Sequence, residues 1–135
     1  MFGMLLVSHG AIGEEMLHAL DHIVGKQEQT AAISIAPDDD MDECRNQILS
    51  KIKEVNTGDG VVLLADMFGG TPNNLAISVM PKTDAVVLAG FNLPVLVKLA
   101  SLRESASLQE AVEEAAASGR KYIQVVTENL AAPAS

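Results

Sequence analysis

Short apolar runs alternate with longer segments of helical periodicity along this chain. Four runs have the length and composition of strands, at residues 4–8, 30–36, 60–66 and 84–90. The run from Gly60 to Asp66 is continuously apolar in its interior, which is typical of a parallel sheet whose two faces are covered by helices. A shorter run at 121–126 is expected to form a last strand.

The segments between these runs carry apolar residues at helical intervals, together with capping signals. Asp40 and Ser107 each stand three residues before a glutamate, which is the spacing of a capping box. Thr71 followed by Pro72 predicts an N-cap and a proline at the first helical position, and Gly119 predicts a helix end. Helices are therefore expected at residues 13–24, 41–55, 71–80, 93–103 and 108–119.

Strands that alternate with helices predict an α/β fold with an open, mostly parallel sheet and helices on both faces. One domain is expected over residues 1–126, because 135 residues is an ordinary domain length and no internal repeat divides the chain. Residues 127–135 contain Ala and Pro without periodicity, and we expect them to form a disordered tail.

Composition narrows the classes of function. A net charge of −9 without any Lys/Arg cluster disfavours nucleic acid and anionic lipid as partners, whereas an acidic surface suits a basic protein partner. No apolar stretch approaches the length of a membrane span and no basic segment precedes the first apolar run, so neither membrane insertion nor a signal peptide is expected. The single cysteine, Cys44, excludes an internal disulfide and fits a cytoplasmic protein.

Three of the predicted strand ends carry residues that suggest chemistry. Open parallel sheets bind ligands beyond the carboxyl ends of their strands, and here these ends are Ser8-His9-Gly10, Asp66 followed by MFGGTPNN, and Gly90 followed by FNLP. If the strands are neighbours, the three ends meet at one rim. His9 can act there as a nucleophile or a proton carrier. A carboxylate at Asp66 can hold one ring N–H of His9 and leave the other nitrogen free to attack.

The sequence after Asp66 has the features of an anion site. Gly69 and Gly70 permit a tight turn in which successive N–H groups face an anion, and Thr71 adds a hydroxyl at a helix N-terminus, where the dipole favours phosphate. The pattern predicts a phosphohistidine intermediate, with His9 and Asp66 as catalytic residues and with Gly69, Gly70 and Thr71 as a phosphate-binding loop. We expect no cofactor and no metal, and no lysine follows the glycines as it would in a Walker A loop.

Each of these features also has a structural interpretation. A strand-end His9 can be a packed residue, Asp66 can cap the turn that follows it, and Gly-Gly-Thr-Pro can be an ordinary entry into a helix. The GFNLP stretch can line the site or only begin a helix, and its place at the rim favours the site. His18 and His22 could chelate a metal across one helical turn, but they fall on the polar side of their helix, which favours a solvated face.

Three motifs resemble a known family in their order and spacing: LLVSHG near the start, LLADMFGGTPNN in the middle and VVLAGFNLPVL later. They are similar to the mannose-class IIA domains of the bacterial phosphoenolpyruvate-dependent sugar phosphotransferase system, over residues 1 to about 126. The resemblance implies that His9 accepts a phosphoryl group from the phosphocarrier protein HPr and that Asp66 pairs with its imidazole. It also implies that Gly69, Gly70 and Thr71 flank the phosphoryl group.

The resemblance further implies a partner set. Members are homodimers that exchange their C-terminal strand, which is 121–126 here, and they pass the phosphoryl group to a histidine of a IIB component. The expected function is thus a phosphotransferase in sugar uptake. In several members an Ala/Pro-rich linker continues into a IIB domain, whereas this sequence ends at Ser135. A regulatory protein, whose His9 phosphorylation controls binding to a target without sugar transport, therefore stays open.

Two other classes also place a histidine at the end of a first strand. Histidine phosphatases and mutases have an arginine before it, where this chain has Ser8, and they use a second active-site histidine, whereas none follows His22 here. The phosphocarrier of dihydroxyacetone kinase lacks a loop of the GGTPNN type. Both alternatives therefore rank below the mannose class.

Overall fold

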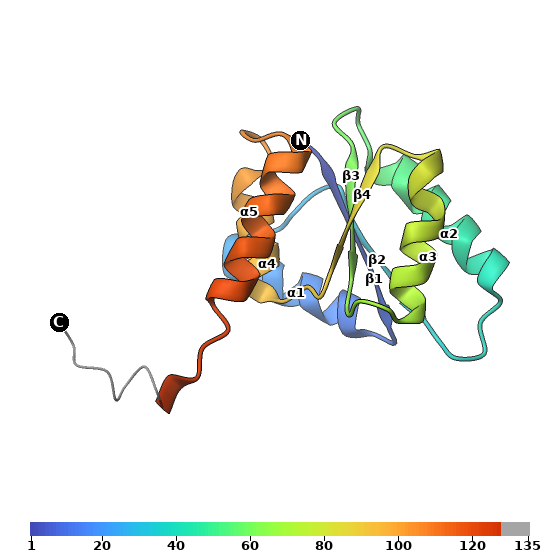
Figure 1. The fold of residues 1–135 in the computed structure, drawn as a ribbon. Helices are drawn as coiled ribbons and strands as arrows, with labels where there is room; N and C mark the ends of the chain where they lie inside the picture. Colours follow the sequence, from blue (N-terminus) through green and yellow to red (C-terminus); the bar gives the residue numbers. More distant parts are fainter. Residues whose placement is uncertain (128–135) are drawn as a thin grey trace.

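The computed structural model describes residues 1–127 of the 135-residue chain. Its centre is a parallel sheet of four strands in the order β2-β1-β3-β4 (Figure 1). The strands are β1 (Gly3–His9), β2 (Thr30–Ile35), β3 (Val61–Ala65) and β4 (Ala85–Ala89). The helices are α1 (Ile12–Val24), α2 (Met41–Val55), α3 (Thr71–Val79), the 3-10 turn η1 (Met80–Lys82), α4 (Leu93–Leu102) and α5 (Leu108–Lys121).

Helices cover both faces of this sheet, as the uninterrupted apolar strands predict. Alternate residues of β1 face opposite sides: Leu5 and Val7 pack in a core under α2 and α3, and Met4 and Leu6 pack in a second core under α1, α4 and α5 (Figure 1). Since both faces are buried, the interior positions of β1 and β3 are apolar, except for Ser8 near the end of β1. The predicted open, parallel α/β fold is confirmed.

The capping signals place two helix starts correctly and one incorrectly. Asp40 accepts hydrogen bonds from the N–H groups that follow it at the start of α2, and Ser107 Oγ accepts one from the Glu110 N–H. At α3, however, the N-cap is Gly70 rather than Thr71, because the first intrahelical bond runs from the Asn74 N–H to the Gly70 carbonyl. Thr71 is thus the first helical residue, and its hydroxyl is not used for capping.

The predicted helix end at Gly119 is wrong. Helix α5 continues through Gly119 to Lys121, and Gly119 is buried against α4. A Cβ at this position would lie 2.5 Å from Cγ2 of Val95, so the glycine is needed for close packing of the two helices. The Asn92 side chain also donates a hydrogen bond to the Gly119 carbonyl (3.1 Å).

The predicted strand at 121–126 is also wrong for the single chain. Lys121 is the last residue of α5, and the chain after it leads away from the sheet (Figure 1). Ile123 is 72% exposed and Val126 is 61% exposed. A strand needs a neighbour to hydrogen-bond with, and in one chain this segment does not reach the open edge of β4. The expected disordered tail falls mostly on residues 128–135, which lie outside the described residues.

Candidate functional site

The site lies where the order of the strands reverses. From β1 the chain passes to β2 on one side, and β3 and β4 lie on the other side. Helix α1, which follows β1, packs on one face of the sheet, and α3, which follows β3, packs on the other. The carboxyl ends of β1 and β3 therefore border a crevice at the switch point, which is where ligands of such sheets bind. His9 is the last residue of β1, and Asp66 follows β3 directly.

His9 and Asp66 are in direct contact. Nδ1 of His9 lies 2.8 Å from Oδ2 of Asp66, and the His9 backbone N–H donates to the same oxygen at 2.9 Å. The other carboxylate oxygen accepts a hydrogen bond from the Met67 N–H at 3.0 Å. The side chain of Asp66 is only 12% exposed, whereas that of His9 is 49% exposed. The pairing predicted from two separate strand ends is thus present, and about half of the His9 side chain stays exposed.

Hydrogen bonding determines the charge of the carboxylate and the tautomer of the ring. Burial raises the pKa of Asp66, but hydrogen bonds from the His9 backbone and imidazole, and the charge of His9, together hold this pKa below its ordinary value. An ionised carboxylate can only accept hydrogen bonds. We therefore assign the ring proton to Nδ1 of His9, which leaves a lone pair on Nε2 of this half-exposed ring.

The glycine loop is in contact with the ring. A Cβ on Gly70 would lie 3.0 Å from Cε1 and 3.6 Å from Nε2 of His9, so a side chain here would press on this edge of the imidazole and require a small shift of the ring. Gly69 has φ +86°, in the left-handed region that a side chain disfavours. The N–H groups of Gly70 and Thr71 precede the first intrahelical bond of α3, so they belong to the N–H groups that a helix start leaves without a partner in the helix.

Thr71 lies beside His9 as well. It lines a cavity of about 330 Å³ together with His9 and Gly10. The rest of the lining is apolar, from the end of β2 to the start of α2: Ile35, Ala36, Pro37 and Met41. Of the predicted site residues, His9 and Thr71 line this cavity. Asp66 and Gly70 are in contact with the His9 ring. Gly69 shapes the loop that connects them.

Ser8 is a residue whose importance the sequence did not reveal. It is fully buried, its hydroxyl accepts a hydrogen bond from the Gly13 N–H (2.9 Å), and it donates to the Gly10 carbonyl (3.1 Å). These bonds fix the turn that carries His9 from β1 into α1. A serine followed by glycines two and five residues later was the available signal, but local spacing alone does not distinguish this turn from a solvated one.

The GFNLP stretch does not line the cavity beside His9. Asn92 caps α4 by accepting a hydrogen bond from the Val95 N–H (3.0 Å). With Gly90 it lines a different, smaller cavity of about 110 Å³ against α5. The preference for a place in the site was therefore wrong, and the helix-start interpretation accounts for these residues.

The remaining candidates have structural explanations. His18 and His22 are exposed on α1, and residues 1–127 contain no group of three or more side chains arranged to hold a metal ion. Cys44 is buried on α2, and burial, followed by the charges of nearby acidic residues, raises the pKa of its thiol. Within the same described range, no helix is long and apolar enough to cross a membrane.

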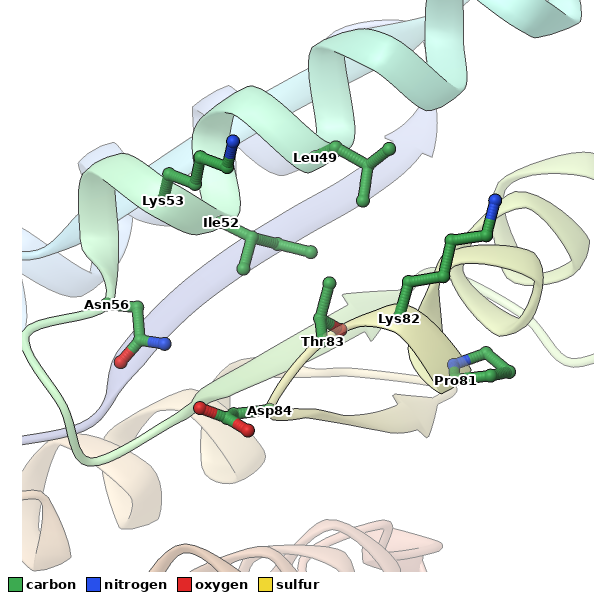
Figure 2. A pocket seen from close by; sticks show the side chains of 8 residues that line it. All are labelled: Leu49, Ile52, Lys53, Asn56, Pro81, Lys82, Thr83 and Asp84. Atoms are coloured by element: carbon green, nitrogen blue, oxygen red, sulfur yellow. The ribbon is translucent and has the colours of Figure 1, made fainter.

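A larger cavity, of about 440 Å³, lies between α2 and the start of β4, at the opposite edge of the sheet from His9 (Figure 2). Leu49 and Ile52 of α2 line it on one side, and Thr83 and Asp84 line it on the other. Lys53 extends from the last turn of α2, where a cation stabilises the helix dipole. This cavity holds no nucleophile paired with a base, so the His9 edge is the better candidate for group transfer.

The fold and the site together define a class: a doubly wound parallel α/β protein whose switch point carries a histidine hydrogen-bonded to a carboxylate. A family model described as "PTS system fructose IIA component" (EIIA-man) matches residues 3–116. The chain belongs to this family of IIA components of the sugar phosphotransferase system.

Relatives in sequence and structure agree with this assignment. The mannose-specific EIIAB component of Escherichia coli K12 is 29% identical over 125 residues, or 91% of this chain. The fructose-specific EIIA component of Bacillus subtilis is 26% identical over 96% of this chain and 90% of its own length. A mannose/sorbose-specific IIA subunit from Enterococcus faecalis superposes with a TM-score of 0.80 at 27% identity, covering 91% of this chain and 92% of that one.

The relatives differ in how much of their own length this chain matches. It spans 39% of the length of the Escherichia coli relative, which combines IIA and IIB parts, whereas it spans most of the Bacillus subtilis protein. Family membership supports a phosphoryl-transfer role in the sugar phosphotransferase system.

Proposed function

We propose that this protein is a phosphocarrier that accepts a phosphoryl group from phospho-HPr on Nε2 of His9. It then passes the group to a histidine of a mannose-class IIB component during sugar uptake. The observation that carries the proposal is the 2.8 Å contact between His9 Nδ1 and the ionised, mostly buried carboxylate of Asp66. That contact turns Nε2 away from the carboxylate, on a side chain that is 49% exposed, so that a donor can approach its lone pair.

The proposed transfer is an in-line displacement between two imidazoles. The Nε2 lone pair of His9 forms a bond to phosphorus while the bond from phosphorus to the donor nitrogen breaks, and that electron pair returns to the donor ring. Because Nδ1 keeps its proton, the His9 ring gains a positive charge. Asp66 stabilises this charge at 2.8 Å. Transfer to IIB is the same step in the reverse sense.

Gly69, Gly70 and Thr71 are proposed to hold the equatorial phosphoryl oxygens. The N–H groups that the start of α3 leaves without helical partners, and the Thr71 hydroxyl on the cavity beside His9, support this role. Gly70 contributes in a second way, because its lack of a side chain lets the loop approach the edge of the ring that carries Nε2.

A homodimer is part of the proposal. After α5, four apolar side chains are exposed: Tyr122, Ile123, Val125 and Val126. The outer edge of β4 pairs with no strand within residues 1–127. Pairing of 121–126 with β4 of a second copy would cover the exposed side chains and the open edge of β4. Size-exclusion chromatography with light scattering tests this dimer, and a species of 14.2 kDa, the mass of one chain, would contradict it.

A regulatory role is the second candidate. In that case phosphorylation of His9 changes binding to a target protein, and no IIB component receives the group. The same His9–Asp66 pair supports both roles. The cytoplasm is the proposed compartment for either one, since the single cysteine is a buried thiol that forms no disulfide.

One experiment separates these functions. The protein is incubated with phosphoenolpyruvate, enzyme I and HPr, and acid-labile phosphate is measured on the wild type and on His9→Ala. His22→Ala serves as a control that removes an exposed histidine from the same segment. Label on the wild type and on the control, but not on His9→Ala, supports the carrier. Absence of label on the wild type contradicts it. Candidate IIB proteins then discharge the label in a transport relay and leave it in place in a purely regulatory protein.

A further inference from the structure

Strand β2 forms an outer edge of the sheet. Within residues 1–127 it pairs with β1 and with no other strand. The carbonyl of Gln29 accepts a hydrogen bond from the Met4 N–H (3.0 Å), and the carbonyl of Ile35 accepts one from the residue that follows β1 (3.1 Å). Because backbone groups alternate in direction along a strand, the N–H and C=O groups of Ala32 and Ser34 point away from β1. An extended segment beside β2 would find these groups in position for pairing.

The open edge of β2 lies in a groove between α1 and α2. Two cavities, of about 430 and 360 Å³, adjoin along it. One is lined by residues 32–34 and the other by 30–32, while Glu14 of α1 and Lys51 of α2 line both. Successive strand residues point to opposite faces of a sheet, so a cavity that touches three in a row lies at the edge of the strand. This β2 groove therefore has room along the strand for a segment of about five residues.

The walls of the β2 groove are acidic. Glu14 and Asp21 line it from α1, and Glu54 lines it from α2. Lys51 is the one lysine or arginine in this lining, and it is already paired with Glu54 at 3.0 Å. Pairing of two β2 edges from two copies of the chain would bring these carboxylates together, and like charges disfavour it. A segment that carries lysine or arginine is instead complementary to the groove.

We propose that the β2 groove binds an extended, basic segment of a partner protein, which adds to the sheet as a strand beside β2. Backbone hydrogen bonds at Ala32 and Ser34 hold the segment, and the carboxylates of Glu14 and Asp21 select its cations. The groove shares no lining residue with the cavity beside His9. The inference therefore goes beyond the proposed function and does not depend on it.

Titration of the whole chain with a short peptide, followed by ¹H–¹⁵N NMR, tests the β2 groove. The probe is a hexapeptide of alternating lysine and valine with blocked ends, and the same peptide with glutamate in place of lysine is the charge control. With the lysine peptide, the amides of Ala32 and Ser34 should shift and exchange more slowly, in the wild type and in His9→Ala alike. The absence of these shifts up to about 5 mM peptide overturns the proposal. An equal response to the glutamate peptide, or shifts confined to Val87 on β4, also overturns it.

Two pairs of variants separate the backbone contacts from the charges. Ser34→Pro removes an outward N–H at an edge position, where proline is tolerated, and should abolish binding of the lysine peptide, whereas Ser34→Ala keeps the N–H and should bind as the wild type does. Glu14→Gln/Glu54→Gln should raise Kd about tenfold, and Glu113→Gln/Glu114→Gln, at exposed positions of α5, should leave it within about twofold. Equal affinities within either pair refute the proposal.

Two controls keep the test decisive. If Ser34→Pro does not fold, the lysine peptide with N-methylated valines removes the same hydrogen bonds from the side of the peptide and should not shift Ala32. Sedimentation measures whether the edge instead joins two copies of the chain. A mass that falls from the wild type to Ser34→Pro, with Ser34→Ala unchanged, would assign the β2 groove to a second copy and overturn the proposed partner.

Discussion

The substitution Gly70→Ala probes the fit between the glycine loop and the imidazole. The backbone of Gly70 is extended (φ −82°, ψ 172°), a conformation that alanine adopts without strain. The only consequence of the added methyl group is therefore contact. It would lie 3.0 Å from Cε1 of His9 and 3.4 Å from Cγ of Met67, where carbon atoms prefer about 3.5–4.0 Å.

The magnitude of the effect can be worked out from these distances. Met67 is flexible and exposed and can move, so relief of the contact on the histidine side requires a ring shift of about 0.5 Å. A shift of that size can lengthen the 2.8 Å bond between Nδ1 and Asp66 beyond the ordinary hydrogen-bond range. Because catalytic groups tolerate little displacement, we expect a loss of about tenfold in the rate of phosphorylation, or about 1.4 kcal/mol in the barrier. The half-exposed ring limits the loss of folding stability to about 1 kcal/mol.

Rapid-quench labelling from phospho-HPr measures the rate, and ¹⁵N-edited NMR of the imidazole reports whether Nδ1 still carries its proton in the bond to Asp66. Ser78→Ala, at an exposed position further along α3, is the control and should match the wild type. A Gly70→Ala protein with unchanged imidazole shifts and an unchanged rate would refute the tight fit between the glycine loop and the ring.

The same contacts, and the packing of α5, make three other predictions. Asp66→Asn removes the negative charge that stabilises the phosphorylated ring and should slow phosphorylation on the order of a hundredfold in single-turnover assays, with the far-ultraviolet circular dichroism spectrum unchanged; a rate within about threefold contradicts that role. Because the pKa of Asp66 is lower in the folded state, its contribution to stability is present above its unfolded pKa of about 3.9 and is lost as the pH falls through the lower folded value. Urea midpoints from about pH 6 to about pH 3 should therefore fall more steeply in the wild type than in Asp66→Asn, and parallel curves would contradict the shift. Gly119→Ala places a methyl group 2.5 Å from Val95 Cγ2 between α4 and α5 and should cost about 1–3 kcal/mol in urea denaturation. Glu114→Ala, at an exposed position of the same helix, should not, and equal midpoints for the two variants would exclude the packing role.

Most of the fold was predictable from local sequence patterns, namely the apolar runs of the strands and the periodicity of the helices. The apolar runs of β1 and β3 are buried on both faces of the sheet, as their short, continuously apolar sequences predict. The errors lie where the deciding contact is distant. Gly119 has the sequence environment of a helix end, and only its contact with Val95 of α4 shows why a glycine is needed inside α5. The run at 121–126 has the composition of a strand, but a strand forms only where an open edge is within reach.

The candidate site was predictable to a similar degree. His9, Asp66, Gly70 and Thr71 were chosen because parallel strands that are neighbours bring their carboxyl ends together, and this inference needs no knowledge of side-chain contacts. The N-cap of α3 was predicted one residue too late, at Thr71 and not at Gly70. A proline is tolerated throughout the first turn of a helix, so Thr71-Pro72 does not distinguish the two positions. The 79% exposure of Phe68, in the loop between Asp66 and α3, could not be inferred from sequence, since an aromatic residue next to glycines is equally compatible with a packed loop.

In the proposed phosphocarrier, Nε2 of His9 carries the phosphoryl group while Nδ1 stays bonded to Asp66. ³¹P and ¹⁵N NMR of the protein after reaction with phospho-HPr, recorded at alkaline pH, distinguishes the two ring nitrogens. We expect one phosphohistidine signal, coupled to Nε2 of His9 and absent from His9→Ala. A phosphoryl group on Nδ1, or a signal that persists in His9→Ala, would contradict this mechanism.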